Sequence, residues 1–254
     1  MKSSDKTDRA TLAALLVRAR ATGQALAAQD LAIPGDIDAA FDVQAEVAML
    51  LGGAIAGWKV GLGPGSEPVA APLTPLVDVE PGTAEFSWHH RLGIEVELAV
   101  RLSEDIGVPP ARSWHRSELL SKIDSVRLGV ELTGSRLVEA SAAPFTLFLA
   151  DSLGNAGYVL GPPLPFDIVD GVASGAVSLA LSGATSWSGR AAHAQGDPLA
   201  PLLAFANSRS SRLCSLRTGQ IVTTGALCGE LRVPRPGRVD IHFHGHHVMG
   251  LKFS

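Results

Sequence analysis

The sequence predicts an α+β protein in which two N-terminal helices precede a strand-rich body. Apolar residues recur at helical spacing between residues 9 and 50, whereas beyond Gly52 the apolar runs are short, alternating and interrupted by glycine and proline. The chain has 254 residues, 46% of them hydrophobic, which is enough to bury a sizeable core. We therefore expect a helical segment over residues 1–54 and a β-rich domain over residues 55–254.

The two N-terminal helices are separated by a clear break. Residues 9–30 carry apolar side chains at helical spacing and predict one amphipathic helix. After the break at Pro34 and Gly35, Asp36 has the position of an N-cap. The second helix is expected to run from there to a stop at Gly52.

Two segments of the body, Ile94–Arg101 and Val126–Thr133, alternate apolar and polar residues and predict strands. Successive side chains of a strand point to opposite faces. Glu95 and Glu97 therefore share one face, and Glu131 lies on the corresponding polar face of another strand.

Shorter signals predict the remaining elements. Ser113–Lys122 is predicted to be a short helix, and Asp197 with Pro198 predicts the cap and first residue of another. The proline-rich stretch Gly63–Leu76 is expected to be a loop that could move over a site. Alternation over Val239–Phe253 predicts a closing hairpin.

The composition argues against several classes of protein. The 25 acidic and 21 basic residues leave a net charge of −4 and form no basic stripe, so we expect no nucleic-acid partner. No apolar run has the length of a membrane span and no secretory signal is recognisable, so we expect no membrane partner and a cytoplasmic location. Cys214 and Cys228 match no metal-site spacing and are expected to remain reduced thiols.

Three glutamates form the first candidate site. Mg2+ prefers carboxylate oxygens, and Glu95, Glu97 and Glu131 would offer three carboxylates from two strands. The alternation by itself favours a simpler interpretation, in which these side chains line the solvent-facing side of an exposed strand.

Lys59 is the second candidate. It is one of five lysines and lies between Trp58 and Val60 in a glycine-flanked apolar strand. There it could bind a substrate carboxylate or transfer a proton, or it could equally point outward from an edge strand. For the isolated Asp78 and Asp151, a turn or capping role is the commoner one.

Several short segments stand in a characteristic order along the chain. They are Gly57–Leu62 (GWKVGL), Thr74–Asp78 (TPLVD), Ile94–Leu98 (IEVEL), Val130–Leu137 (VELTGSRL), Leu149–Ser152 (LADS), Gly157–Gly161 (GYVLG), Gly196–Leu199 (GDPL) and Leu216–Leu227 (LRTGQIVTTGAL). Together they resemble the 2-keto-4-pentenoate hydratase and 4-oxalocrotonate decarboxylase family of the fumarylacetoacetate hydrolase superfamily. The Glu-x-Glu pair with a later glutamate before Gly-Ser-Arg is the most specific of them.

The resemblance implies a fold, a cofactor and a set of site residues. The fold would be the mixed β-sandwich or roll of the fumarylacetoacetate hydrolase C-terminal domain with an N-terminal helical segment, and the cofactor Mg2+ or Mn2+. A homo-oligomer is expected. The implied residues are Lys59 and Asp78 for catalysis, Thr224, Gly225 and Asp151 for substrate binding, and Glu95, Glu97 and Glu131 for the metal.

The sequence also departs from the family pattern. Ser152, Asp197 and Ala226 stand where asparagine, histidine and serine are usual, and residues 63–77 form a shorter segment. The metal set is intact, whereas the residues that select the substrate differ.

The activity that the resemblance implies is that of a metal-dependent lyase. A hydratase of this kind adds water to a 2-hydroxy-2,4-dienoate, a small 2-keto or 2-hydroxy-dienoic acid, and gives a 4-hydroxy-2-ketoacid. Decarboxylation of a 2-oxo-hexenedioate is the sister reaction, for which Arg136 or Arg217 could hold the second carboxylate. An acylpyruvate-type hydrolase would need a His-Glu pair that the sequence does not place. A homologue that binds a keto-acid without turnover is the non-enzymatic alternative.

Overall fold

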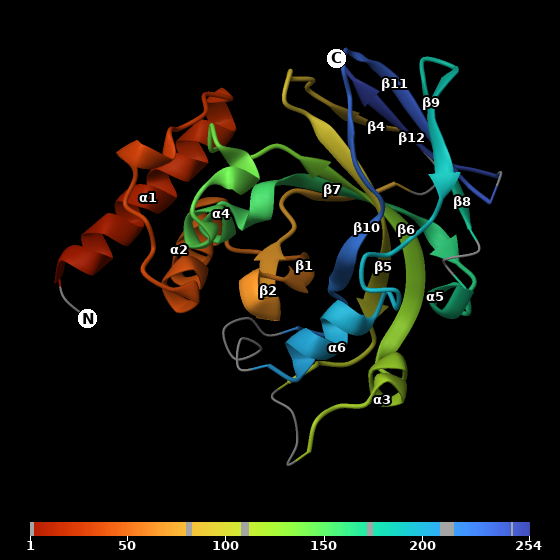
Figure 1. Cartoon of the computed structure of the whole chain (residues 1–254), viewed down its shortest axis with the longest axis horizontal. Coiled ribbons are helices and arrows are strands. Elements are labelled where there is room, and N and C mark those ends of the chain that lie inside the picture. The colour runs from red at the N-terminus through yellow and green to blue at the C-terminus, as the bar shows by residue number, and fades with distance from the viewer. Residues whose placement is uncertain (1–2, 80–82, 108–111, 172–174, 209–215, 245) are drawn as a thin grey trace.

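The computed structural model describes residues 3–79, 83–107, 112–171, 175–208, 216–244 and 246–254. Their strands form a seven-stranded sheet, in the order β2-β1-β10-β5-β6-β7-β3, and a five-stranded sheet, in the order β4-β12-β11-β8-β9. In Figure 1 the N-terminal helices lie at one end of the molecule and the five-stranded sheet at the other. The seven-stranded sheet lies between them.

The N-terminal helices confirm one predicted boundary and correct another. α1 (Ser3–Thr22) ends eight residues before the predicted end at residue 30, because Gly23 adopts a left-handed conformation with φ 70°. Only a short 3-10 turn at Ala28–Asp30 follows. α2 (Ile37–Leu50) begins as predicted, since the Asp36 carboxylate accepts a hydrogen bond from the backbone N–H of Ala39 at 2.8 Å.

The seven-stranded sheet contains both predicted strands. Its members are β1 (Gly57–Leu62), β2 (Pro68–Pro72), β3 (Leu76–Asp78), β5 (Gly93–Leu102), β6 (Ile123–Thr133), β7 (Asn155–Leu164) and β10 (Ile221–Arg232). β10, β5, β6 and β7 run antiparallel to one another in this order, whereas β1 pairs in parallel with β10 and β3 pairs in parallel with β7. The predicted loop over 63–76 is wrong in part, because β2 lies within it and pairs with β1.

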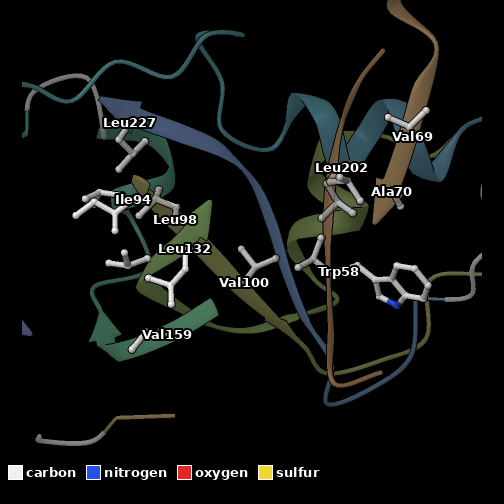
Figure 2. Packing of buried hydrophobic residues seen from close by; sticks show 14 of the residues in the cluster. Trp58, Val69, Ala70, Ile94, Leu98, Val100, Leu132, Val159, Leu202 and Leu227 are labelled. Carbon is white, nitrogen blue, oxygen red and sulfur yellow. The ribbon is translucent and has the colours of Figure 1, made fainter. Parts of the chain in front are cut away.

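The two faces of this sheet differ in character. Ile94, Leu98 and Val100 on β5 point into the main hydrophobic core together with Leu132 of β6 and Val159 of β7, as Figure 2 shows. Residues of the five-stranded sheet and of α6 belong to the same core. The opposite face carries the intervening residues of each strand, including the three glutamates and a smaller apolar cluster around Tyr158.

The five-stranded sheet contains the predicted closing hairpin. Its strands are β4 (Thr83–Phe86), β8 (Ala176–Leu181), β9 (Ala184–Arg190), β11 (Gly237–Phe243) and β12 (His246–Phe253). β11 and β12 are antiparallel neighbours, as the alternation over residues 239–253 predicts.

The remaining helices are short. They are α3 (Arg116–Leu120), α4 (Phe145–Ala150), α5 (Ile168–Gly171) and α6 (Ala200–Ala206). α3 lies within the predicted Ser113–Lys122 helix, but the predicted start at Asp197 is wrong, because α6 begins at Ala200. The Asp197 carboxylate is instead held by the Arg116 guanidinium at 2.7 Å. Within the described ranges, no helix has the length and apolar character that a membrane span requires.

Candidate metal centre

The three glutamates converge as the strand pattern predicts. Glu95 on β5 is the direct register partner of Glu131 on β6, and Glu97 follows two residues along β5 on the same face. One carboxylate oxygen from each lies within 4.8 Å of the others. The interpretation of a solvent-facing row is wrong, since Glu97 and Glu131 are both 0% exposed. The alternation correctly predicts which side chains share a face, and that face points into the protein.

Lys59 supplies the positively charged side chain of this cluster. Its Nζ lies 2.9 Å from Oε1 and 2.8 Å from Oε2 of Glu131. β1 is not a sheet edge, because β2 pairs with its outer side, so the outward-facing alternative does not hold. Burial alone would lower the pKa of Lys59, but the charges of Glu131, Glu97 and Glu95 outweigh it and raise the pKa above its usual range. Lys59 is therefore a fixed ammonium at neutral pH.

Two further side chains, which the sequence analysis missed, hold the carboxylates in place. The Thr223 hydroxyl donates to Oε2 of Glu97, and the Asn155 amide donates to Oε1 of Glu131 at 3.0 Å. Thr223 faces the cluster because β10 aligns it with Ala99 of β5. Its position directly before the predicted Thr224 was the one signal available in the sequence.

The charges of this cluster do not balance. Three carboxylates face one ammonium, and Oε1 of Glu97 has no hydrogen-bond partner among the described residues. Burial, and then the negative charge of Glu131, raises the pKa of Glu97 well above its usual range. Burial likewise raises the pKa of Glu95, against the opposing effect of Lys59. A divalent cation would neutralise the excess charge, and three carboxylate oxygens are donors that a hard cation prefers, so these residues fit such an ion.

Two predicted residues are engaged away from the glutamates. The Asp78 carboxylate pairs with the Arg127 guanidinium through contacts of 2.9 and 3.0 Å, and its side chain is 54% exposed. Asp151 is 2% exposed and accepts hydrogen bonds from the Ser135 hydroxyl at 2.7 Å and from the Arg136 backbone N–H at 3.0 Å. It also pairs with the Arg136 guanidinium. Asp151 thus fastens the turn that follows β6, and its predicted role in substrate binding stays a prediction.

Thr224 and Gly225 lie where β10 departs from regular pairing with β5. The Thr224 carbonyl oxygen lies 3.0 Å from Nε2 of His193, whose Nδ1 accepts from the Gln195 backbone N–H at 3.2 Å. Gly225 has φ 127°, a conformation that favours glycine. The sequence analysis does not identify His193, whose pKa is lowered by burial. Substrate contact by Thr224 and Gly225 stays a prediction.

Solved structures identify the fold. No family model matches the chain. The chain is similar to 4-oxalocrotonate decarboxylase from Pseudomonas putida G7, complexed with magnesium and adipate, with a TM-score of 0.79, 20% identity and 98% of each chain covered. The same enzyme complexed with calcium and acetate gives a TM-score of 0.78 at 20% identity, again over 98% of each chain. The likeness therefore includes the N-terminal helices.

More distant structures cover the β-rich part. A fumarylacetoacetate hydrolase family protein from yeast has a TM-score of 0.55 and 16% identity, over 79% of this chain and 94% of its own. Fumarylpyruvate hydrolase from Pseudomonas aeruginosa, in complex with Mn2+ and pyruvate, has a TM-score of 0.52 and 16% identity, over 77% of this chain and 88% of its own. The chain therefore has the fumarylacetoacetate hydrolase fold, an α+β architecture, which confirms the predicted fold.

Proposed function

We propose that this protein is a metal-dependent hydratase that adds water to a 2-hydroxy-2,4-dienoate and gives a 4-hydroxy-2-ketoacid. The supporting observation is the buried cluster of Glu95, Glu97 and Glu131 with its single compensating ammonium on Lys59. We propose Mg2+ or Mn2+ as the cofactor, in line with the magnesium and manganese complexes of structures that share the fold.

The residues of the cluster have separate tasks in this proposal. Glu95, Glu97 and Glu131 would hold the cation, which when bound supplies Lewis-acid stabilisation for negative charge on a substrate oxygen. Thr223 and Asn155 keep two of these carboxylates oriented. The raised pKa of Lys59 in the metal-free protein favours the role of an anchor for Glu131 over that of a general base. The contacts of Asp78 with Arg127 give no support to its predicted role as general base.

The choice of hydratase over decarboxylase rests on the arginines. A decarboxylase for a dicarboxylic acid needs a cation for the second carboxylate, and Arg136 and Arg217 were the candidates. Arg136 is buried and paired with Asp151, with further hydrogen bonds to backbone carbonyl groups. Arg217 is exposed and paired with Asp105 at 2.8 Å. Neither is held at the glutamates, which favours a substrate with one carboxylate.

Decarboxylation of a 2-oxo-hexenedioate is the second candidate. The observation in its favour is the likeness to 4-oxalocrotonate decarboxylase over 98% of both chains. The same glutamates and Lys59 would serve either reaction, so a direct comparison of substrates is needed.

The test uses metal-stripped protein and 2-hydroxypenta-2,4-dienoate, with and without Mg2+ or Mn2+. We expect metal-dependent loss of the dienol absorbance and formation of the 4-hydroxy-2-ketoacid, both abolished in Glu97→Gln. Glu104→Gln is the matched control, because Glu104 pairs with Lys122 at an exposed site. Release of CO2 from 2-oxo-hexenedioate without hydration of the dienoate would establish the decarboxylase instead. Metal and keto-acid binding without turnover of either substrate would establish a binding protein.

A further inference from the structure

The chain contains one tyrosine, Tyr158, whose side chain is 0% exposed on the inner face of the seven-stranded sheet. β7 aligns Tyr158 with Glu131 of β6. From there its ring leans over Gly129, where a Cβ atom would lie 2.0 Å from the tyrosine oxygen. Gly129 is the register partner of Glu97, so the hydroxyl group reaches the side of the sheet where Glu97 lies. The missing side chain at Gly129 provides the space that the hydroxyl occupies.

The Tyr158 hydroxyl and Oε1 of Glu97 share an uncommon condition. Both are buried; Oε1 of Glu97 has no hydrogen-bond partner among the described residues, and the Tyr158 hydroxyl has none besides the Thr223 side chain, which itself donates to Oε2 of Glu97. Buried polar groups are nearly always paired, because their desolvation is otherwise uncompensated. A phenylalanine would fill the same space without that cost. The tyrosine hydroxyl is a donor and the carboxylate oxygen an acceptor, and burial, followed by the negative charge of Glu97, raises the pKa of Tyr158.

We propose that Tyr158 is a positioning residue of the metal centre, whose hydroxyl donates a hydrogen bond to Oε1 of Glu97 when a cation is bound. Thr223 already donates to Oε2, so the two donors together fix the rotation of this carboxylate. Groups that hydrogen-bond to a ligating carboxylate typically contribute roughly 10–100-fold in metal affinity or activity. This inference rests on the proposed function, because the role of Tyr158 requires that the glutamates bind a cation.

The first test measures Mn2+ affinity of the full chain from the electron paramagnetic resonance signal of free Mn2+. We expect Tyr158→Phe to raise the dissociation constant by about 10-fold or more. Leu160→Val is the matched control, because Leu160 lies on the same strand and in the same small apolar cluster but has no polar atom. It should leave the dissociation constant within about twofold, since it removes packing only.

The second test separates positioning from structure. The melting temperature of metal-free Tyr158→Phe should equal or exceed that of the wild type, because without metal the buried hydroxyl makes no hydrogen bond to Glu97 that the variant could lose. Wild-type protein with 13C at the tyrosine carbon that bears the hydroxyl should give one resonance, since the chain has a single tyrosine. Saturating Mg2+ should shift that resonance.

Three results would overturn the proposal. Wild-type Mn2+ affinity in Tyr158→Phe, with no Mg2+-dependent shift, would remove the role of Tyr158 and leave the proposed function intact. A loss of Mn2+ affinity in Tyr158→Phe, accompanied by a metal-free melting temperature as low as that of Leu160→Val, would make the role of Tyr158 purely structural. Failure of the wild type to bind Mn2+ would remove the proposed function and this inference together.

Discussion

Lys59 and Glu131 are 72 residues apart in the chain, yet Nζ of Lys59 lies within 2.9 Å of both carboxylate oxygens of Glu131. This pair joins β1 to β6 across the inner face of the sheet, where Glu131 is completely buried. Among the described residues, it is the one ion pair that the three glutamates form. The lysine therefore determines how much negative charge the cluster retains.

Removal of this ammonium should destabilise the metal-free protein. Lys59→Met leaves Glu131 buried without its counter-ion, a change that typically costs about 3–5 kcal/mol. Lys122→Met is the control, because Lys122 pairs with an exposed carboxylate on Glu104 and should cost less than about 1 kcal/mol. The free energy of unfolding in urea, with a chelator present, measures both. Equal losses in the two variants would contradict the importance of the buried pair.

Thr223 should matter more than its neighbour. Thr223→Val keeps the shape but removes the hydrogen bond to Glu97, and hydrogen bonds to charged groups contribute about 1.5–3 kcal/mol. The free energy of unfolding should fall by that amount, and Mn2+ should bind less tightly. Thr224→Val serves as the control, because Thr224 contacts His193 through its backbone carbonyl oxygen, which the substitution retains. A larger effect at Thr224 on both measurements would be inconsistent with the geometry.

Gly129 should not tolerate a side chain. In Gly129→Ala the new methyl group would lie 2.0 Å from the tyrosine oxygen and 2.4 Å from ring carbon Cζ of Tyr158. Overpacking of this kind costs about 1–3 kcal/mol, sometimes more. Tyr158→Val should partly rescue the variant, whereas Tyr158→Phe should not, because the ring carbon remains. A double-mutant cycle on the free energy of unfolding measures the coupling.

Asp151 offers a direct test of two roles. As an anchor for Arg136 it is part of a buried ion pair, and Asp151→Asn should lower the free energy of unfolding by about 3–5 kcal/mol. As a substrate-binding residue it would instead change KM while the stability stayed near that of the wild type. Urea unfolding and steady-state kinetics on the same preparation distinguish these outcomes.

His193 should make the protein sensitive to mild acid. Burial lowers its pKa in the folded state below the unfolded value of 6.5, against the opposing effects of the hydrogen bond with the Thr224 carbonyl oxygen and of the charge of Asp197. The unfolded chain then binds the proton first, so the free energy of unfolding falls as the pH drops through 6.5 to the folded pKa and levels off below it. His193→Gln retains a donor and an acceptor and should reduce that slope. Urea unfolding between neutral and mildly acidic pH measures it, and an unchanged slope would assign the titration elsewhere.

The sequence predicts local features of the site better than distant ones. Alternation is a property of neighbouring residues, so it correctly groups Glu95 with Glu97 and matches Glu131 to them. It contains no information on whether that face meets solvent, or on the contact of Glu131 with Lys59 of the distant strand β1. The pairing of Asp78 with Arg127 has the same origin, since the two come from strands that are not sequence neighbours.

The ends of the helices and the register of irregularly paired strands could also not be predicted from the sequence. The helix over residues 9–30 was predicted too long because one glycine in a polar stretch is a weak signal, although Gly23 ends it. The family motif indicates Thr224 and not Thr223, because the register of β10 against β5, and not the TTG motif itself, places Thr223 beside Glu97. Motif matching places a site to within a residue or two, and strand register decides which side chain enters it.

The parallel pairing of β1 with β10, which aligns Lys59 with Thr223, has a consequence for biosynthesis. β1 lies in the N-terminal part of the chain and β10 near the other end, so the cluster of Lys59, Thr223 and the glutamates forms only after β10 has been synthesised. Contacts between residues so distant in sequence slow folding, because a long loop must close before any of them forms. During translation no intermediate length short of β10 can assemble the glutamates with both Lys59 and Thr223. Ligand occupancy at this centre would therefore report that synthesis and folding of the seven-stranded sheet are both complete.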